Sequence, residues 1–174
     1  MRTPVATWLI LIAVIIIRPA IAPDHPAIWK ILEPTIRAVE TYPLPSAMTE
    51  TDALAYWLSP NHEVFVAEEN GEVVGTYYLR ANQQGPGSHV ANCGYITAPW
   101  ATGRGIARAM CQHSFERATA RGFRAMQFNF VVSTNHAAVH LWLALGFEII
   151  GEIPAAFQHP AKGLVSAYVM YRKL

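Results

Sequence analysis

The sequence predicts a single domain of the mixed α/β class, in which helices flank a sheet of about seven strands. Its length of 174 residues matches one domain. Hydrophobic residues make up 52% of the chain and charged residues 14%, a balance that supplies a packed core and excludes a disordered chain. Apolar segments with strand and with helix periodicity succeed one another without a repeat or a linker, so no second domain is expected.

The first part of the chain predicts one strand, two helices and a hairpin. Residues 15–20 are typical of a core strand that ends in a turn, and a helix is expected from Asp24 to Glu40 with Pro34 as a kink or break. Thr49 begins a second, short helix. Strands 63–68 and 72–80 follow, joined by an Asn-Gly turn.

The remaining elements alternate between strand and helix patterns. They are a strand over 89–97, a helix over 105–120, a strand over 125–132, a helix over 135–145, and final strands over 147–153 and 165–171. A loop is expected from Pro154 to Gly163 between the last two strands. The predicted order is therefore βα(α)βββαβαββ.

The N-terminus allows two interpretations. Val5 to Ile17 is apolar and Ala20-Ile21-Ala22 fits a signal-peptide cleavage pattern, so residues 1–22 could direct export. Cleavage there would remove the strand at 15–20, and we favour an intact cytoplasmic domain over 11–174, with residues 1–10 an extension or an early start. The apolar run is shorter than the roughly 20 residues of a spanning helix, so no stable membrane insertion is expected.

Several classes of function are disfavoured by composition. The formal net charge is +1 without a clustered basic face, so no nucleic-acid partner is expected. Cys93 and Cys111 lack zinc-ligand spacing, and His136 and His140 share a helix face without a third ligand. We therefore expect no metal.

A glycine-rich turn before the helix over 105–120 is the first candidate for chemistry. Gly103-Arg104-Gly105-Ile106-Ala107 allows a ligand close to the backbone, and free N–H groups at a helix start bind phosphate. The alternative is a plain turn. The segment lacks the GK[ST] of a Walker loop and the third glycine of a dinucleotide fingerprint, so a different phosphate ligand is indicated.

A second motif, Asn135-x-x-Ala138-x-x-Leu141-Trp142-x-x-x-Gly146-Phe147, follows the strand over 125–132. Together the two motifs resemble the GNAT family of N-acetyltransferases, whose phosphate motif [QR]-x-x-G-x-[GA] corresponds to residues 102–107. The resemblance implies a mostly antiparallel sheet with a splay between the fourth and fifth strands. It also implies acetyl-CoA as cosubstrate and direct attack by an amine.

The resemblance assigns residues to acetyl-CoA. The pyrophosphate would lie on the amides of residues 103–107, and the pantetheine arm beside the strand end, with the Ile96 N–H as a one-donor oxyanion site. The implied cofactor-binding residues are Ile96, Thr97, Ala98, Gly103, Arg104, Gly105, Ile106, Ala107, Asn135 and Trp142.

Two positions depart from the family pattern. Thr102 replaces a polar anchor, so affinity would depend on backbone amides and Arg104. Trp142 replaces a tyrosine that often protonates the leaving thiolate, so water would supply that proton or the thiolate would leave unaided. These departures keep open an alternative function, a catalytically idle acyl-CoA-binding or sensor module.

The acceptor site is predicted from asparagines within apolar strands. Asn92 and Asn129 would either satisfy local backbone groups or hold a substrate carboxylate or the reacting carbonyl. The pattern over 128–135, with Gly151-x-x-Pro154, is similar to fungal acetyltransferases that act on azetidine-2-carboxylate and proline analogues. A small amino or imino acid is therefore the expected partner, with Tyr42 also in contact.

Candidate bases are few. Glu40, at the end of the first helix, is a candidate remote base, and His89 is another. The alternative for each is a solvated surface residue, and we favour that alternative for both. The apolar composition also allows a homodimer.

Overall fold

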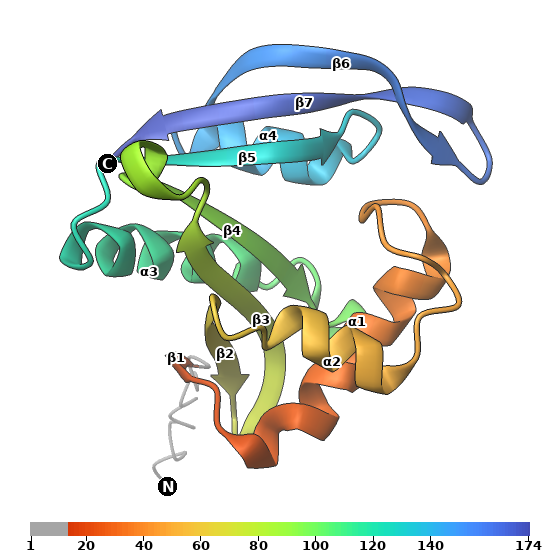
Figure 1. The fold of residues 1–174 in the computed structure, drawn as a ribbon. Coiled ribbons are helices and arrows are strands. Elements are labelled where there is room, and N and C mark those ends of the chain that lie inside the picture. Colours follow the sequence, from red (N-terminus) through yellow and green to blue (C-terminus); the bar gives the residue numbers. More distant parts are fainter. Residues whose placement is uncertain (1–13) are drawn as a thin grey trace, which may run out of the picture.

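The computed structural model describes residues 14–174 as one seven-stranded sheet flanked by helices (Figure 1). The expectation for residues 1–10 lies outside the described residues. The strand order is β1-β2-β3-β4-β5-β7-β6, and every neighbouring pair is antiparallel except β4–β5. The strands are β1 Ile15–Pro19, β2 Glu63–Glu69, β3 Glu72–Ala81, β4 Val90–Thr97, β5 Ala125–Val132, β6 Glu148–His159 and β7 Gly163–Lys173.

The predicted splay between the fourth and fifth strands is present. β4 and β5 pair through Val90–Ala125 and Ala91–Met126, and no later pair joins them. From Asn92 onward the strands separate, so that the β5–β7–β6 layer opens away from β3 and β4 (Figure 1). The splay leaves one edge of β4 without a strand partner, which positions the site described below.

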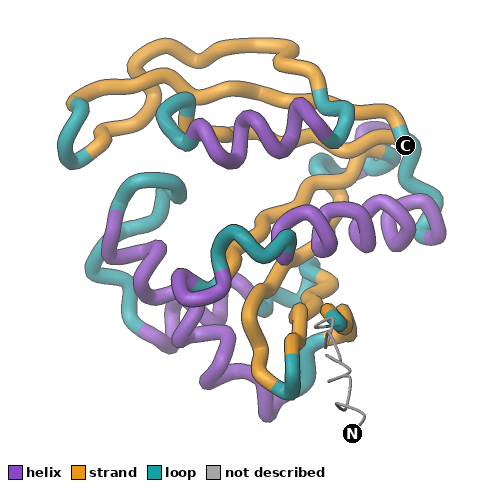
Figure 2. Tube along the Cα trace, turned by 180° about the vertical axis from the view of Figure 1, so that it is seen from behind, coloured by secondary structure: helices purple, strands orange, loops and turns teal. Residues whose placement is uncertain are grey.

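Helices cover both sides of β3 and β4. They are α1 His25–Ala38, α2 Glu50–Trp57, α3 Ile106–Ala120 and α4 His136–Ala144. The Trp57 indole of α2 donates to Thr76 Oγ1 at 3.0 Å, whereas Tyr77 bonds His113 of α3 at 2.6 Å, so α2 and α3 lie on opposite faces. Seen from behind, one helix lies along the β5–β7–β6 layer, in the position of α4 (Figure 2).

The start of α1 differs from the prediction. The Asp24 carboxylate does not cap α1. It accepts from the Ile21 N–H at 2.9 Å and pairs with Arg18 of β1 at 2.7 Å. The hydrogen bond from Arg18 is the main reason that the pKa of Asp24 is lowered. This ion pair connects β1 to the residue that directly precedes α1. Cleavage after Ala22 would remove β1 from the sheet.

Two further elements depart from expectation. Pro34 lies within α1 without splitting it, and the helix ends at Ala38 because Val39 adopts a left-handed φ of 53°. The expected loop from Pro154 to Gly163 is mostly strand. β6 continues to His159 through an irregularity between Ile153 and Phe157, where a proline without an N–H can be accommodated. Within residues 14–174, no helix is long and apolar enough to cross a membrane.

Candidate active site

One cavity of about 490 Å³ lies where the loop after β4 meets the start of α3. Gly103 and Gly105 line it with φ of 77° and 81°, and a Cβ added at either would meet nothing within 4 Å. Gly105 is the N-cap of α3, and no side chain caps the helix. The first-turn N–H groups therefore remain available for an anion. We call residues 103–107 the cradle and this space the cradle cavity.

The side chain of Arg104 does not line the cradle cavity, contrary to its expected role. Its Nη1 donates to Glu69 Oε2 at 2.9 Å and its Nη2 donates to Trp100 O at 2.8 Å. The carboxylate of Glu69 is buried, which favours this pairing over contact with a ligand. Arg104 thus anchors the cradle loop to the end of β2, and Arg108 is the cation that lines the cavity.

The β3–β4 ladder decides which amides face the splay. Asn82 N–H donates to Val90 O and Ala98 N–H donates to Val74 O, each at 2.8 Å. Bonded positions recur at every second residue of an antiparallel ladder, so the even-numbered residues of β4 bond to β3. Ile96 is one of these, and its N–H points away from the opening.

The backbone N–H and C=O groups of the odd-numbered residues of β4 therefore face the splay. These residues are Cys93, Tyr95 and Thr97, and Tyr95 O accepts from the Tyr42 hydroxyl on that side at 3.1 Å. The predicted oxyanion role of the Ile96 N–H does not fit this geometry, because that group faces β3, and strand periodicity in the sequence does not reveal which edge each amide faces. The splay-facing N–H groups on either side of Ile96 belong to Tyr95 and Thr97, and of these two residues only Tyr95 lines both cavities.

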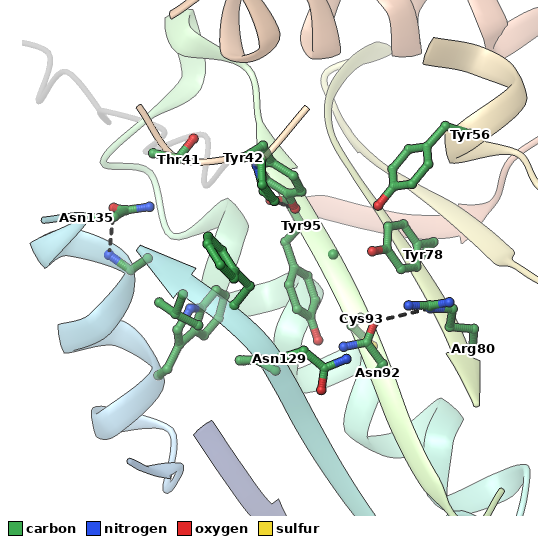
Figure 3. A pocket seen from close by; sticks show the side chains of 17 residues that line it. Thr41, Tyr42, Tyr56, Tyr78, Arg80, Asn92, Cys93, Tyr95, Asn129 and Asn135 are labelled. Atoms are coloured by element: carbon green, nitrogen blue, oxygen red, sulfur yellow. Dashed lines mark hydrogen bonds between the residues drawn. The ribbon is translucent and has the colours of Figure 1, made fainter. Parts of the chain in front are cut away.

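A second cavity, of about 230 Å³, shares Tyr42 and Tyr95 with the first, and Figure 3 shows these two side chains among its lining residues. We call it the acceptor cavity. Its walls come from the segment after α1, from α2, β3, β4 and β5, and from α4. They are largely aromatic, with polar groups from Arg80, Asn92 and Asn129. Gly94 is required beside Tyr78, because a Cβ at this position would lie 2.6 Å from the ring.

The two cavities share a set of lining residues, which we call the junction. The junction consists of Thr41, Tyr42, Tyr95, Asn135, Ala138 and Trp142. Asn135 caps α4, its Oδ1 accepting from the Ala138 N–H at 3.3 Å. The Trp142 ring packs against Tyr95 with centroids 5.2 Å apart. A ligand in the cradle cavity can therefore meet one in the acceptor cavity at the junction.

A chain of amide side chains closes the far end of the acceptor cavity. Arg80 Nε donates to Asn92 Oδ1 at 3.3 Å, and Asn92 Nδ2 donates to Gln127 O at 2.9 Å. Gln127 Nε2 donates to Asn129 Oδ1 at 2.9 Å, and Asn129 Nδ2 donates to Asn82 Oδ1 at 2.7 Å. Asn92 and Asn129 thus satisfy local partners and still line the cavity.

Burial keeps the phenols and the thiol of this region protonated. Desolvation raises the pKa of Tyr42 and of Tyr95 well above the usual value, and it also raises that of Tyr78. The pKa of the Cys93 thiol is raised by burial as well, so Cys93 is not a nucleophile at neutral pH.

The two candidate bases lie away from both cavities. Glu40 is exposed in the bend after α1 and lines neither cavity. His89 is exposed, with its ring bonded to Pro86 O. In the described part of the chain, no histidine or carboxylate lines either cavity, and no cluster of three metal-binding side chains occurs.

Sequence reasoning missed most of the acceptor-cavity lining, including Tyr56, Tyr78 and Arg80. Tyr56 and Tyr78 are both labelled in Figure 3 with Arg80. The tyrosines could not be distinguished from core aromatics. Arg80 did carry a signal, because it is a charged residue at the end of an apolar strand.

Comparison with known proteins agrees with this geometry. The model of the Acetyltransferase (GNAT) family matches residues 26–147. The N-acetyltransferase aca1 of Schizosaccharomyces pombe is 27% identical over an alignment of 147 residues, and the match covers 75% of this chain and 70% of that protein.

Solved structures give the same result. A GCN5-related N-acetyltransferase from Kribbella flavida is 41% identical, with a TM-score of 0.88 over 92% of this chain and 98% of that one. A phosphinothricin acetyltransferase from Sinorhizobium meliloti, solved in complex with acetyl-CoA, is 25% identical, with a TM-score of 0.79 over 92% and 88%. Family match, identity and splayed sheet lead to one conclusion: this chain belongs to the GNAT family of acetyltransferases.

Proposed function

We propose that the protein transfers the acetyl group of acetyl-CoA to the amine of a small amino or imino acid by direct attack. The observation that carries this proposal is the meeting of two cavities at the junction, across the splay between β4 and β5. One cavity has free backbone donors, and the other has an aromatic and polar lining.

The cradle cavity has the features that acetyl-CoA requires. The two glycines leave open space above the first turn of α3, and we assign the pyrophosphate to the amides of residues 103–107. The unpaired edge of β4, with Tyr95 and Thr97, would hold the pantetheine arm, while Ala98, Asn135 and Trp142 would flank it. Acetyl-CoA supplies the activated acetyl group, and the Tyr95 N–H would orient its carbonyl oxygen.

The acceptor cavity favours a small molecule. Its volume of about 230 Å³ is below the roughly 300 Å³ at which drug-sized pockets begin. The resemblance of residues 128–135 to acetyltransferases of azetidine-2-carboxylate supports an amino or imino acid. In this assignment Asn129 and Tyr42 contact the acceptor, and the role of Asn129 is to orient it.

We assign proton removal from the amine to water. The cavity has no carboxylate or histidine among the described residues that line it, and burial raises the pKa of Tyr42 and of Tyr78, so these two phenols hold their protons. The thiolate leaves without a side-chain acid at Trp142.

The test is a thiol-release assay with acetyl-CoA and a panel of amino and imino acids. We expect release that depends on the amine. We also expect Asn129→Ala to lower kcat/KM by about fivefold, the value of one hydrogen bond, without changing the Kd of acetyl-CoA. Binding of acetyl-CoA without release for any amine would instead indicate an idle acyl-CoA-binding module, as the loss of the tyrosine at position 142 suggests.

A further inference from the structure

Arg80 is the one charged side chain among the described residues that line the acceptor cavity. It stands near the end of β3, and Figure 3 shows it beside Asn92 at the far end of the cavity from Tyr42. No carboxylate shares this lining. The cavity therefore has a positive electrostatic bias, which disfavours a purely cationic amine and favours an acceptor that carries an anion.

The charge of Arg80 has no protein counter-ion within residues 14–174. Five other arginines pair with carboxylates at 4.0 Å or less, namely Arg18, Arg37, Arg104, Arg117 and Arg121. Arg80 forms no such pair in the described chain. A half-buried guanidinium without a counter-ion is costly, and a bound anion would lower that cost.

The bond with Asn92 leaves the binding end of Arg80 available. Nε is used at 3.3 Å, and no described residue accepts a hydrogen bond from either Nη. Asn92 is 5% exposed and is itself fixed by Gln127 O, so it can hold the guanidinium in place. Two free Nη groups in one plane are the arrangement that binds a carboxylate through two parallel hydrogen bonds.

The position of Arg80 also agrees with the geometry of the reaction. Along the β3–β4 ladder, Tyr77 pairs with Tyr95 and Arg80 pairs with Asn92. Arg80 is thus three residues, about 10 Å, from the junction along the strand direction. This interval separates backbone positions, and the Arg80 side chain takes up part of it, so a small acceptor would lie between the guanidinium and the junction.

We propose that Arg80 binds the carboxylate of the acceptor, with the amine directed toward the junction. This inference rests on the proposed function and adds the group that selects the substrate. It distinguishes amino and imino acids from simple amines. The same carboxylate could belong to a free amino acid or to the C-terminus of a peptide, and the small cavity favours the free amino acid.

The experiment compares three matched acceptors, namely an amino or imino acid, its primary amide, and the amine that lacks the carboxyl group. The amide has nearly the same shape and no charge. For the unaltered protein we expect kcat/KM to be roughly 10- to 100-fold higher for the acid than for the amide, as for a hydrogen bond to a charged group. Most of the difference should lie in KM, because the contact is made before the reaction.

Arg80→Gln should bring the acid-to-amide ratio close to one, because it should lower kcat/KM for the charged acid far more than for the neutral amide. Arg80→Lys keeps the charge but loses the paired geometry, so it should retain an intermediate ratio. Arg124→Gln is the matched control, because this substitution removes the same net charge at an exposed residue that lines neither cavity. Its ratio should equal that of the unaltered protein.

The Kd of acetyl-CoA, measured for each variant, reports whether the fold and the cradle are intact. If Arg80→Gln no longer binds acetyl-CoA normally, the test depends on Arg80→Lys alone. An acid-to-amide ratio in Arg80→Lys equal to that of the unaltered protein then overturns the inference. An equal ratio in Arg80→Gln and the unaltered protein also overturns it, as does a dipeptide that is a better acceptor than the free amino acid. If no acceptor stimulates thiol release, the proposed function itself is contradicted. If an amine stimulates release equally well with and without a carboxylate, only the inference about Arg80 is contradicted.

Discussion

The cradle cavity and the acceptor cavity meet at one junction but are built from different parts of the chain. The cradle is a continuous segment, residues 103–107, and offers mainly backbone N–H groups. The acceptor cavity is lined by side chains from segments distant in sequence, such as Tyr42, Arg80, Asn92 and Asn129. The first depends on backbone conformation, whereas the second depends on which side chains the fold brings together.

This difference separates the residues that would bind the cosubstrate from those that would select the acceptor. A backbone site tolerates changes of side chain, as the exposed Thr102 and the diverted Arg104 illustrate. A side-chain site changes its ligand with a single substitution. Specificity for the acceptor can therefore change without alteration of the cradle.

The largest effect within this comparison is expected from Gly105→Ala. Gly105 has φ of 81°, and a left-handed conformation costs a non-glycine residue about 1–2 kcal/mol. The added methyl group would also point into the open space of the cradle. We expect the Kd of acetyl-CoA to rise by about tenfold, measured by calorimetry, with KM for the acceptor nearly unchanged.

Gly71→Ala is the matched control for that substitution. Gly71 lies in the β2–β3 turn with φ of 82°, and its Cβ would also meet nothing within 4 Å. Both variants should lose about 1–2 kcal/mol of folding stability, seen as similar decreases in Tm. A rise in Kd for Gly71→Ala as well would show that backbone strain, rather than the cradle, controls binding.

A smaller effect is expected from Tyr42→Phe at the junction. The substitution removes a hydrogen bond of 3.1 Å to Tyr95 O and retains the ring, which lies 6.2 Å from the ring of Trp57. A loss of about 1 kcal/mol, or about fivefold in kcat/KM, is expected. Because Tyr42 borders both cavities, steady-state kinetics should show changes in both KM values. Tyr56→Phe should alter only the acceptor KM, since Tyr56 lines that cavity alone.

The smallest effect is expected from Glu40→Gln. Glu40 is exposed and lines neither cavity, so kcat, both KM values and the pH–rate profile should remain within about twofold of the unaltered protein. A general base contributes about 100-fold or more. A loss of that size, with a changed acidic limb in the profile, would contradict water as the proton acceptor.

Much of the fold followed from local pattern. Alternating and helical apolar spacing predicted the seven strands and four helices, because each period reports which face of an element is buried. The ends of two elements differ from the prediction. Val39 and the irregularity near Pro154 shifted the bounds of α1 and β6, since packing and pairing decide where an element stops.

The sequence by itself determined the α/β architecture, the family resemblance and the position of the cradle. These depend on short-range periodicity and on glycines that allow positive φ. Only the tertiary structure decided that the backbone N–H of Tyr95, and not that of Ile96, faces the splay. It also decided that Arg104 pairs with Glu69, and that Arg80 lines the acceptor cavity whereas Glu40 does not. Such contacts join residues far apart in the chain, and no local period in the sequence encodes them.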